Sequence, residues 1–252
     1  SVFRMIELLA ESEVQAVLSA GNTGAVVAAS QMKARTLKGV RRPGISVVMP
    51  TYYGPVVVID VGANIKCRPA QMVQFAVMAS VYSRLVLGIE QPRVGLLSIG
   101  EEEIKGNVLV RETRDLLKEA PIHFCGNAEG RDVFNGRFDV IVCDGFVGNV
   151  LLKVVEAMAE GMFQTIEADV AEAEPELARR LGPTLKKVRD RHDYTTYGGA
   201  PLLGIDGICI ICHGSSKARA IRNGLKVAAQ YSEHQVNAAI QAELAPTGEI
   251  SK

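Results

Sequence analysis

The sequence predicts an α/β fold in which helices cover both faces of a largely parallel β-sheet. Short runs of β-branched and apolar residues, without polar alternation, alternate along the chain with longer segments of helical periodicity. That alternation is typical of strands buried on both faces and joined by crossover helices. The 252 residues are 48% hydrophobic and 22% charged, which is the composition of a globular protein that builds its own core.

Seven strands are predicted, most of them leading into a loop rich in Gly, Asn, Asp or Ser. They occupy residues 14–19, 45–49, 56–59, 94–99, 122–125, 140–143 and 207–212. Helices are predicted within residues 24–37, 69–87, 106–119, 149–170 and 215–244, and Phe3, Ile6 and Leu9 lie on one face of a short helix that opens the chain. Because parallel strands need right-handed crossovers, these elements predict three layers: helices, sheet and helices.

One segment departs from this alternation. Within residues 160–191 a carboxylate-rich stretch precedes Gly182-Pro183, and Lys and Arg residues lie on either side of that pair. We predict two helices that project from the sheet as a hairpin, broken at Gly182-Pro183 because proline lacks the backbone N–H group. The whole chain, 1–252, is predicted to be a single domain with this hairpin inserted in it. The hairpin is interpreted as a solvated charged arm or as a contact for a partner protein or a membrane.

The charge and cysteine content exclude several classes of protein. Lys plus Arg and Asp plus Glu both number 28, so a general affinity for nucleic acid is not expected. No stretch is long and apolar enough to indicate a membrane span, and the start of the chain does not resemble a signal peptide. The five cysteines are an odd number, and three lie in or beside apolar runs, which indicates reduced thiols and a cytoplasmic protein.

A local charge imbalance stands out against this neutral background. Residues 14–59 contain no carboxylate, yet five basic residues fall within ten positions. A solvated helix end and a docking surface for an acidic partner both explain this pattern. The five residues are Lys33, Arg35, Lys38, Arg41 and Arg42.

Five strand-to-helix loops combine glycine with polar side chains. These loops span residues 19–25, 60–64, 100–107, 143–149 and 212–216. In a parallel sheet the carboxyl ends of the strands meet at one edge, where helix N-termini offer free N–H groups to an anion. We therefore expect one shared anion site, most simply for phosphate. Lys105 and His213 would supply positive charge and proton transfer, with Asp60 and Asp144 orienting them.

Several familiar motifs are absent or misleading. The chain contains no G-x-G-x-x-G, no G-x-x-x-x-G-K-[ST], no G-x-S-x-G and no H-E-x-x-H. Cys209-Ile-Ile-Cys212-His213 matches the haem-attachment pattern, but alternation along a strand would point the two thiols to opposite faces. We interpret it as a buried strand that ends in a site histidine. Neither a metal ion nor a cofactor is predicted.

The loops also carry a family resemblance. VLSAGNTGA, VIDVGANIKCRPAQMVQFAVMASVYS, PRVGLLSIGEEEIKGN, FCGNAEGRDVFNGRFDVIVCDGFVGNVLLK and YGGAPLLGIDGICIICHGSSKARAIRN strongly resemble the PlsX family over residues 14–228. Those proteins are phosphate acyltransferases of bacterial phospholipid synthesis, which convert acyl-[acyl carrier protein] and inorganic phosphate to acyl phosphate. The resemblance implies a three-layer fold similar to isocitrate and isopropylmalate dehydrogenases and phosphotransacetylases, and a homodimer.

Two features of the family are not matched. Family members begin with a further strand and an Asp-x-Met-Gly-Gly-Asp loop at the same sheet edge, which has no counterpart here, so that part of the fold is expected to be absent. The family hairpin can carry an apolar tip for peripheral membrane docking, whereas residues 160–191 hold few large apolar side chains. Only a weak membrane contact is therefore expected.

The resemblance and the loop positions together imply roles for individual residues. Lys105, Asp144 and His213 are the catalytic candidates, with Lys105 neutralising phosphate or the oxyanion of the tetrahedral intermediate. The predicted substrate-binding residues are Asn22, Thr23, Gly24, Asp60, Asn64, Glu101, Asn107, Asn149 and Ser215. Two alternatives stay open: a phosphotransacetylase-like enzyme that uses acyl-coenzyme A, and a non-catalytic scaffold associated with the membrane.

Overall fold

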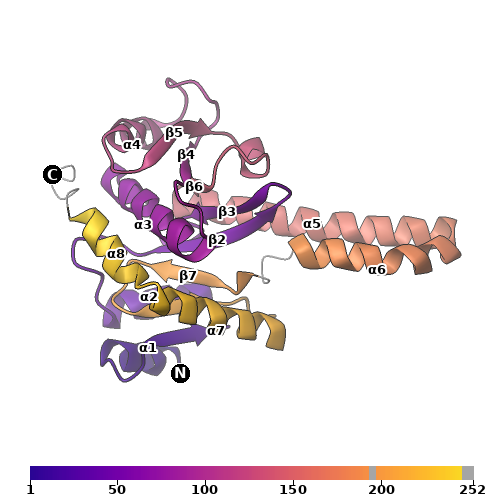
Figure 1. The fold of residues 1–252 in the computed structure, drawn as a ribbon, viewed down its shortest axis with the longest axis horizontal. Coiled ribbons are helices and arrows are strands. Elements are labelled where there is room, and N and C mark those ends of the chain that lie inside the picture. Colours follow the sequence, from indigo (N-terminus) through magenta and orange to yellow (C-terminus); the bar gives the residue numbers. More distant parts are fainter. Residues whose placement is uncertain (193–196, 246–252) are drawn as a thin grey trace.

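The computed structural model describes residues 1–192 and 197–245 and confirms the three-layer α/β fold (Figure 1). An eight-stranded sheet has the order β1-β8-β7-β2-β3-β6-β4-β5. The strands are β1 (Ala16–Ser19), β2 (Gly44–Thr51), β3 (Gly54–Ile59), β4 (Arg93–Leu97), β5 (His123–Ala128), β6 (Val140–Val142), β7 (Ala200–Leu203) and β8 (Ile208–Ile211). The helices are α1 (Val2–Ala10), α2 (Thr23–Lys33), α3 (Pro69–Leu87), α4 (Val108–Lys118), α5 (Gly145–Ala173), α6 (Pro175–His192), α7 (Ala218–Glu233) and α8 (Val236–Leu244), with a 3₁₀ turn at Gly130–Val133.

The core lies on both faces of the sheet, because successive side chains of a strand point to opposite sides. In β3, Val57 and Ile59 belong to the apolar cluster under α3, α4, α7 and α8. Val56 and Val58 belong to the cluster under α1, α2 and the first turns of α5. Continuous apolar runs are thus explained by burial on both faces, as the sequence predicted.

The strand directions differ from the expected largely parallel sheet. Four strand pairs are parallel, but β2 pairs antiparallel with both β3 and β7, and β7 pairs antiparallel with β8. As a result β1, β8 and β2 run in one direction and the other strands in the opposite one. The five polar loops therefore leave the sheet at two ends: 19–25 and 212–216 at one, and 60–64, 100–107 and 143–149 at the other. The expectation of a single edge is wrong, because it assumed that every strand was parallel.

Two elements were not predicted from the sequence. Strand β7 comes directly after Gly198 and Gly199, which both have positive φ. It is only four residues long, so its hydrophobic periodicity is too short to predict a strand. The predicted long helix 215–244 is divided into α7 and α8 at Gln235, whose φ is 50°. The Asn237 side chain just after this break donates to the backbone oxygens of Ile205 and Gly207, which holds α8 against the sheet.

The projecting hairpin is confirmed, but its position is corrected. Helix α5 begins at Gly145 and runs unbroken to Ala173, and the chain turns at Glu174 rather than at Gly182-Pro183. A proline disfavours helical backbone at the residue before it, so α5 ends before Glu174. Proline is favoured in the first turn of a helix, so Pro175 starts α6. Pro183 lies inside α6, because packing of α6 along α5 outweighs its local cost. Figure 1 shows both helices extending well beyond the sheet.

Helix α3 is the most deeply buried helix of the fold. By length and composition it is, among the described residues, the one helix that could cross a membrane, and 67% of its apolar window is buried within the protein. Twelve consecutive residues, from Met72 to Ser83, are buried against the sheet and against neighbouring helices. Its apolar character is therefore that of a core helix.

The start of α5 packs so closely on the 60–64 loop that two positions require glycine. A Cβ atom on Gly148 would overlap the backbone oxygen of Asp60 and lie 2.8 Å from Cys143 Sγ. A Cβ atom on Gly145 would lie 2.7 Å from the backbone oxygen of Asn64. The absence of side chains at these positions is what brings the α5 N-terminus against the loop.

We expect Gly148→Ala to lower the free energy of unfolding by about 2 kcal/mol or more, because the added methyl forces the helix off the loop. Gly161 lies in the middle of the same helix, where an added Cβ atom would meet open space. Gly161→Ala should therefore raise stability by up to about 1 kcal/mol through helix propensity. Urea unfolding followed by circular dichroism measures both; equal effects of the two substitutions would contradict the assigned packing.

Candidate functional site

A cavity of about 280 Å³ lies on the sheet face covered by α1, α2 and α5. Its floor consists of Ile45, Val47, Ala200 and Ile211, where β2, β7 and β8 come together. Helix α5 starts at one end of the sheet and runs across this face, so four of the five polar loops contribute to one cavity. The polar side chains in its lining are those of Thr23, Asn149, Lys153, Glu156, His213 and Ser216, and glycine backbone lines it at Gly24, Gly62 and Gly199.

Two helix N-termini converge on the cavity. Helix α2 follows β1 and α7 follows β8, and because these strands are parallel neighbours their following helices begin at the same end of the sheet. The Asn22 side chain caps α2 by accepting from Ala25 N at 2.9 Å, which leaves the N–H groups of Thr23 and Gly24 without helical partners. Unpaired N–H groups and the positive dipole end of a helix favour an anion.

His213 and Ser215 form a pair at the rim of this cavity. His213 Nδ1 lies 2.6 Å from Ser215 Oγ and 3.3 Å from Ser215 N. A backbone N–H group can only donate, so Nδ1 accepts here and the proton of the neutral imidazole is carried by Nε2. The predicted histidine is thus oriented by the serine that follows it, and its remaining nitrogen can donate to a ligand.

Three cavity residues with polar side chains were missed by the sequence analysis. Lys153 and Glu156 lie on α5 and form an ion pair of 2.7 Å, and Ser216 follows the predicted Ser215. Ser216 Oγ is buried and has no hydrogen-bond partner among the described residues. Lys153 and Glu156 lie one and two turns beyond Asn149, so helical spacing from that predicted site residue could have indicated them.

Ser216 offers a test of anion binding in the cavity. We expect Ser216→Ala to raise the Kd for inorganic phosphate about tenfold, since a hydrogen bond to a charged group is worth about 1.5–3 kcal/mol. Stability should not fall, because the substitution removes a buried hydroxyl without a partner. Ser83→Ala is a matched control, as Ser83 Oγ is also buried and unpaired but lies in α3. A tenfold change with Ser83→Ala, or none with Ser216→Ala, would contradict the assignment.

Asp60 organises the loop that closes one side of the cavity. Its carboxylate accepts from the backbone N–H groups of Ile45, Gly62, Ala63 and Asn64 at 2.7–3.1 Å, and from Asn64 Nδ2 at 2.9 Å. Burial raises the pKa of the Asp60 carboxyl, and these donors oppose the shift. Asn64 Nδ2 also donates to Pro43 O at 2.7 Å. Both predicted residues therefore position backbone, and neither lines the cavity.

Asp144 and Asn149 lie at the start of α5 and have separate roles. Asp144 caps the helix, accepting from Phe146 N and Val147 N at 3.0 Å each. Asn149, one turn later, lines the cavity beside Gly62. The cap fixes where α5 begins and so where Asn149 and Lys153 are placed.

The loop 100–107 does not line this cavity. Asn107 caps α4 by accepting from Val110 N, and the Lys105 side chain is exposed. Because β4 pairs with β6 up to the contact of Leu96 with Val142, this loop leaves the sheet next to the loop 143–149. Lys105 therefore lies on the neighbouring loop rather than in the cavity wall, and its predicted catalytic role stays a proposal.

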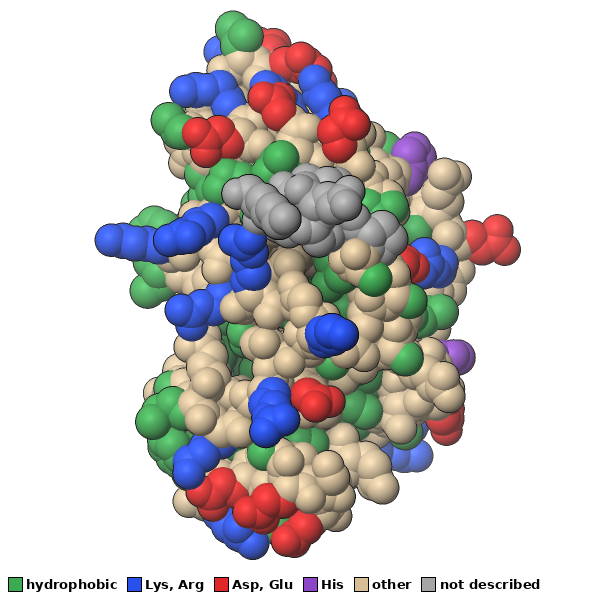
Figure 2. Space-filling view, turned by 90° about the vertical axis from the view of Figure 1, so that its left-hand side faces the viewer, with side chains coloured by type: hydrophobic (Ala, Val, Ile, Leu, Met, Phe, Trp, Pro, Cys, Tyr) green, Lys and Arg blue, Asp and Glu red, His purple; other side chains and the backbone are tan. Residues whose placement is uncertain are grey.

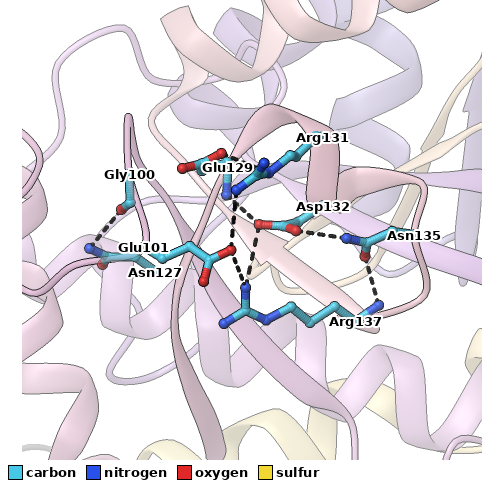
Figure 3. A network of polar contacts seen from close by, with 8 residues as sticks. All are labelled: Gly100, Glu101, Asn127, Glu129, Arg131, Asp132, Asn135 and Arg137. Atoms are coloured by element: carbon cyan, nitrogen blue, oxygen red, sulfur yellow. Dashed lines mark hydrogen bonds and ion pairs between the residues drawn. The ribbon is translucent and has the colours of Figure 1, made fainter.

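A polar network holds this loop in place (Figure 3). Buried Asn127 donates from Nδ2 to the backbone oxygens of Gly100 and Glu102, at 3.2 and 2.9 Å. The Glu101 carboxylate pairs with Arg137 at 2.8 Å and with Arg131 at 3.5 Å. Glu101, predicted to bind substrate, is thus placed outside the cavity, where its contacts fix the conformation of the loop that carries Lys105.

The thiols near the site are not activated. Burial raises the pKa of the Cys67 thiol to about 12 and also raises the pKa of Cys143 and Cys212. Cys212 lines the cavity, but a protonated thiol is a weak nucleophile. The site is therefore suited to binding an anion and stabilising charge rather than to nucleophilic catalysis by a cysteine.

The chain is similar to known proteins along nearly its whole length. The model of a family described as "Fatty acid synthesis protein" matches residues 1–239. A phosphate acyltransferase of Geotalea uraniireducens is 47% identical over 236 residues, covering 92% of this chain and 67% of that protein. A phosphate acyltransferase of Heliobacterium modesticaldum is 49% identical over 243 residues, covering 96% and 72%. The chain thus spans about two thirds of the length of these relatives.

Solved structures show the same fold at low sequence identity. The EutD phosphotransacetylase of Staphylococcus aureus superposes with a TM-score of 0.61 at 16% identity, covering 92% of this chain and 67% of that one. A phosphotransacetylase of Streptococcus pyogenes gives 0.62 at 16% identity with the same coverage. The family match and the high identity of the curated relatives show that this chain belongs to the phosphate acyltransferase family of fatty acid synthesis proteins.

Proposed function

We propose that this protein transfers an acyl group from acyl-[acyl carrier protein] to inorganic phosphate, forming acyl phosphate for phospholipid synthesis in the bacterial cytoplasm. The observation that carries the proposal is the cavity in which two helix N-termini, His213, Ser216 and Lys153 converge. This set of donors matches a phosphate dianion. A thioester is already activated, so a bound phosphate needs no enzyme nucleophile to attack it.

The chemical step is a direct displacement. A phosphate oxygen attacks the thioester carbonyl, the new C–O bond forms, and the C–S bond breaks to release the thiol. Hydrogen phosphate brings one proton and the departing thiolate takes one up, so the step balances without an added acid. His213, held by Ser215 through Nδ1, is proposed to donate its Nε2 proton to the departing thiolate and then to take up the phosphate proton at the same nitrogen.

Lys153 and Lys105 are proposed to stabilise different negative charges. Lys153 lies in the cavity wall with Glu156 as its ion-pair partner, which suits it to hold phosphate. Lys105 lies on the loop beside 143–149 and is proposed to face the carbonyl oxygen, where charge develops in the tetrahedral intermediate. Asn149, which also lines the cavity, is proposed to orient the carbonyl.

The function is tested by the formation of acyl phosphate, trapped as the hydroxamate with hydroxylamine. Acyl-[acyl carrier protein] with phosphate should yield hydroxamate, and omission of phosphate should abolish it. Acyl-coenzyme A, tested in parallel, distinguishes the proposed enzyme from the phosphotransacetylase-like alternative. Absence of product from both thioesters, with carrier protein still bound, would favour the scaffold interpretation.

An exposed apolar stripe on α5 supports a homodimer. Phe146, Val150, Val154, Met158, Met162 and Ile166 recur at every fourth position and are each 40–60% exposed. Such a continuous apolar surface on a projecting helix is unfavourable in water and marks a contact. We propose that a second copy of this chain covers it, with the acyl chain of the substrate entering along its edge near Leu152 of the cavity.

We expect Met158→Glu to convert the dimer to a folded monomer, because a charge in the apolar contact is left without water. Light scattering after size-exclusion chromatography measures the mass. Gln164→Glu is the matched control, since it adds the same charge at an exposed position of α5 outside the stripe. A monomeric wild-type protein would contradict the dimer. Binding of the wild type to lipid vesicles, lost in Met158→Glu, would instead assign the stripe to the weak membrane contact.

A further inference from the structure

The loop that closes the cavity leads directly to a basic surface. Between Val14 and Ile89 the sequence holds eight Lys and Arg residues and a single carboxylate, Asp60. Asp60 is fully buried, so this part of the chain presents no negative side chain to solvent. In a protein with no net charge, such a concentration of one sign creates a local positive field.

Three hydrogen bonds bring two separate basic segments together. Gln74 in α3 donates from Nε2 to Gly39 O at 2.7 Å and accepts from Arg41 N at 2.9 Å. Asn64 Nδ2 donates to Pro43 O at 2.7 Å. These contacts place the loop before β2 against the loop that leads into α3. We define the basic face as the exposed residues of these loops, namely Lys38, Arg41, Arg42, Lys66 and Arg68.

Most of these charges have no counter-ion in the protein. Within residues 1–192 and 197–245, Lys38, Arg42, Lys66 and Arg68 form no ion pair with a carboxylate. Figure 2 shows Lys and Arg side chains gathered across the middle of this side of the molecule, with Asp and Glu mostly towards its upper and lower ends. A group of like charges without counter-ions in the described residues favours a partner of opposite charge.

The basic face adjoins the cavity and includes an apolar centre. Gly62 lines the cavity, and Lys66 follows four residues later, so their Cα atoms are no more than about 14 Å apart. Ile65, between them, is 70% exposed. An exposed apolar residue beside basic ones is typical of a protein contact, and its distance from the cavity suits a thioester carried on a flexible arm.

We propose that the basic face is the docking surface for the acyl carrier protein, an acidic protein that would present its thioester to the cavity across the 60–66 loop. This inference rests on the proposed function and names the place where its macromolecular substrate binds. Electrostatic attraction accelerates association and is screened by salt. Binding should therefore weaken steeply as the salt concentration rises.

The test compares two double charge reversals. Lys66→Glu with Arg68→Glu changes the basic face, and Arg180→Glu with Lys187→Glu makes the same net change on exposed residues of α6. Binding of fluorescently labelled acyl-[acyl carrier protein] is measured by anisotropy at low salt and at about 0.3 M salt. We expect the first variant to raise Kd at least about tenfold at low salt and to lose most of the salt dependence, and the second to match the wild type.

Three results would overturn the docking surface: no binding by the wild type, unchanged binding by the Lys66 and Arg68 variant, or equal loss in both variants. Acyl phosphate formation is measured in parallel. If the wild type binds carrier protein through this face but forms no acyl phosphate, the proposed function is wrong and the docking surface stands. Vesicles of phosphatidylglycerol and phosphatidylethanolamine serve as the second probe, and loss of vesicle binding alone in the first variant would assign the face to anionic lipid and overturn the proposal.

Discussion

Replacing Lys105 with alanine should lower kcat/KM for acyl phosphate formation by about 10²–10³, because one well-placed donor to a developing oxyanion is typically worth about 3–4 kcal/mol. Stability should be unchanged, since the side chain is exposed. The loop itself stays anchored through Asn127 and Glu101, so the loss would report the ammonium group. Hydroxamate formation at saturating phosphate measures the rate, and thermal unfolding measures stability.

Lys118→Ala is the matched control for Lys105. The Lys118 ammonium pairs with Glu103 of the same loop at 2.7 Å, so its removal deletes one cation beside the loop without touching the proposed carbonyl site. An exposed pair of this kind contributes little, and activity should stay within about twofold of the wild type. A rate for Lys105→Ala within about tenfold of the wild type would remove Lys105 from the mechanism and leave Lys153 as the cation at the site.

Replacing Asp60 with alanine should destabilise the fold by at least about 4 kcal/mol, since several buried N–H groups would lose their acceptor at about 1–3 kcal/mol each. The groups affected belong to Ile45 of β2 and to the 62–64 loop, so the strand and the cavity wall would lose their connection together. Domains of this kind are stable by only about 5–15 kcal/mol. Urea unfolding followed by circular dichroism measures the loss.

Asp60→Asn keeps the size and shape of the side chain and removes only its charge, so it separates the effect of the charge from that of packing. Its amide nitrogen would face N–H donors on at least one side, because both carboxylate oxygens accept hydrogen bonds, so it too should lose several kcal/mol. Asp169→Ala is the control, as Asp169 is an exposed carboxylate on α5. A loss below about 1 kcal/mol for both Asp60 variants would contradict its role as the acceptor that organises the loop.

The three layers of the fold could be predicted from the sequence, because a strand that is buried on both faces consists almost entirely of apolar residues. Seven of the eight strands overlap the predicted ones, most of them continuous apolar runs, and the bounds of α3 are the predicted ones. Strand β7 was not predicted, because four residues between glycines are too few to show a hydrophobic periodicity. Gly182-Pro183 indicated a helix break that packing of α6 on α5 prevents, whereas Glu174-Pro175 makes the break through backbone sterics.

The candidate site was predicted in part for the same reason. Polar loops with glycine are visible in the sequence, and Thr23, Gly24, Asn149 and His213 do line one cavity. The assumption of a single sheet edge was wrong, since strand direction depends on long-range pairing. Lys153 and Glu156 reach the cavity because α5 crosses the sheet, and they follow Asn149 at helical spacing. Ser216 reaches it from the loop between β8 and α7.

The sequence by itself determined the alternation of strands and helices, the polar loops and the family, because these depend on local periodicity and on short stretches of residues. The tertiary structure decided which loops meet, because the antiparallel pairing of β2 and β7 sends them to two ends of the sheet and α5 joins the ends again. It also decided that the Asp60 and Asp144 carboxylates accept hydrogen bonds from backbone N–H groups. What a carboxylate does depends on which donors surround it, and in a folded chain those donors can come from segments far apart in the sequence.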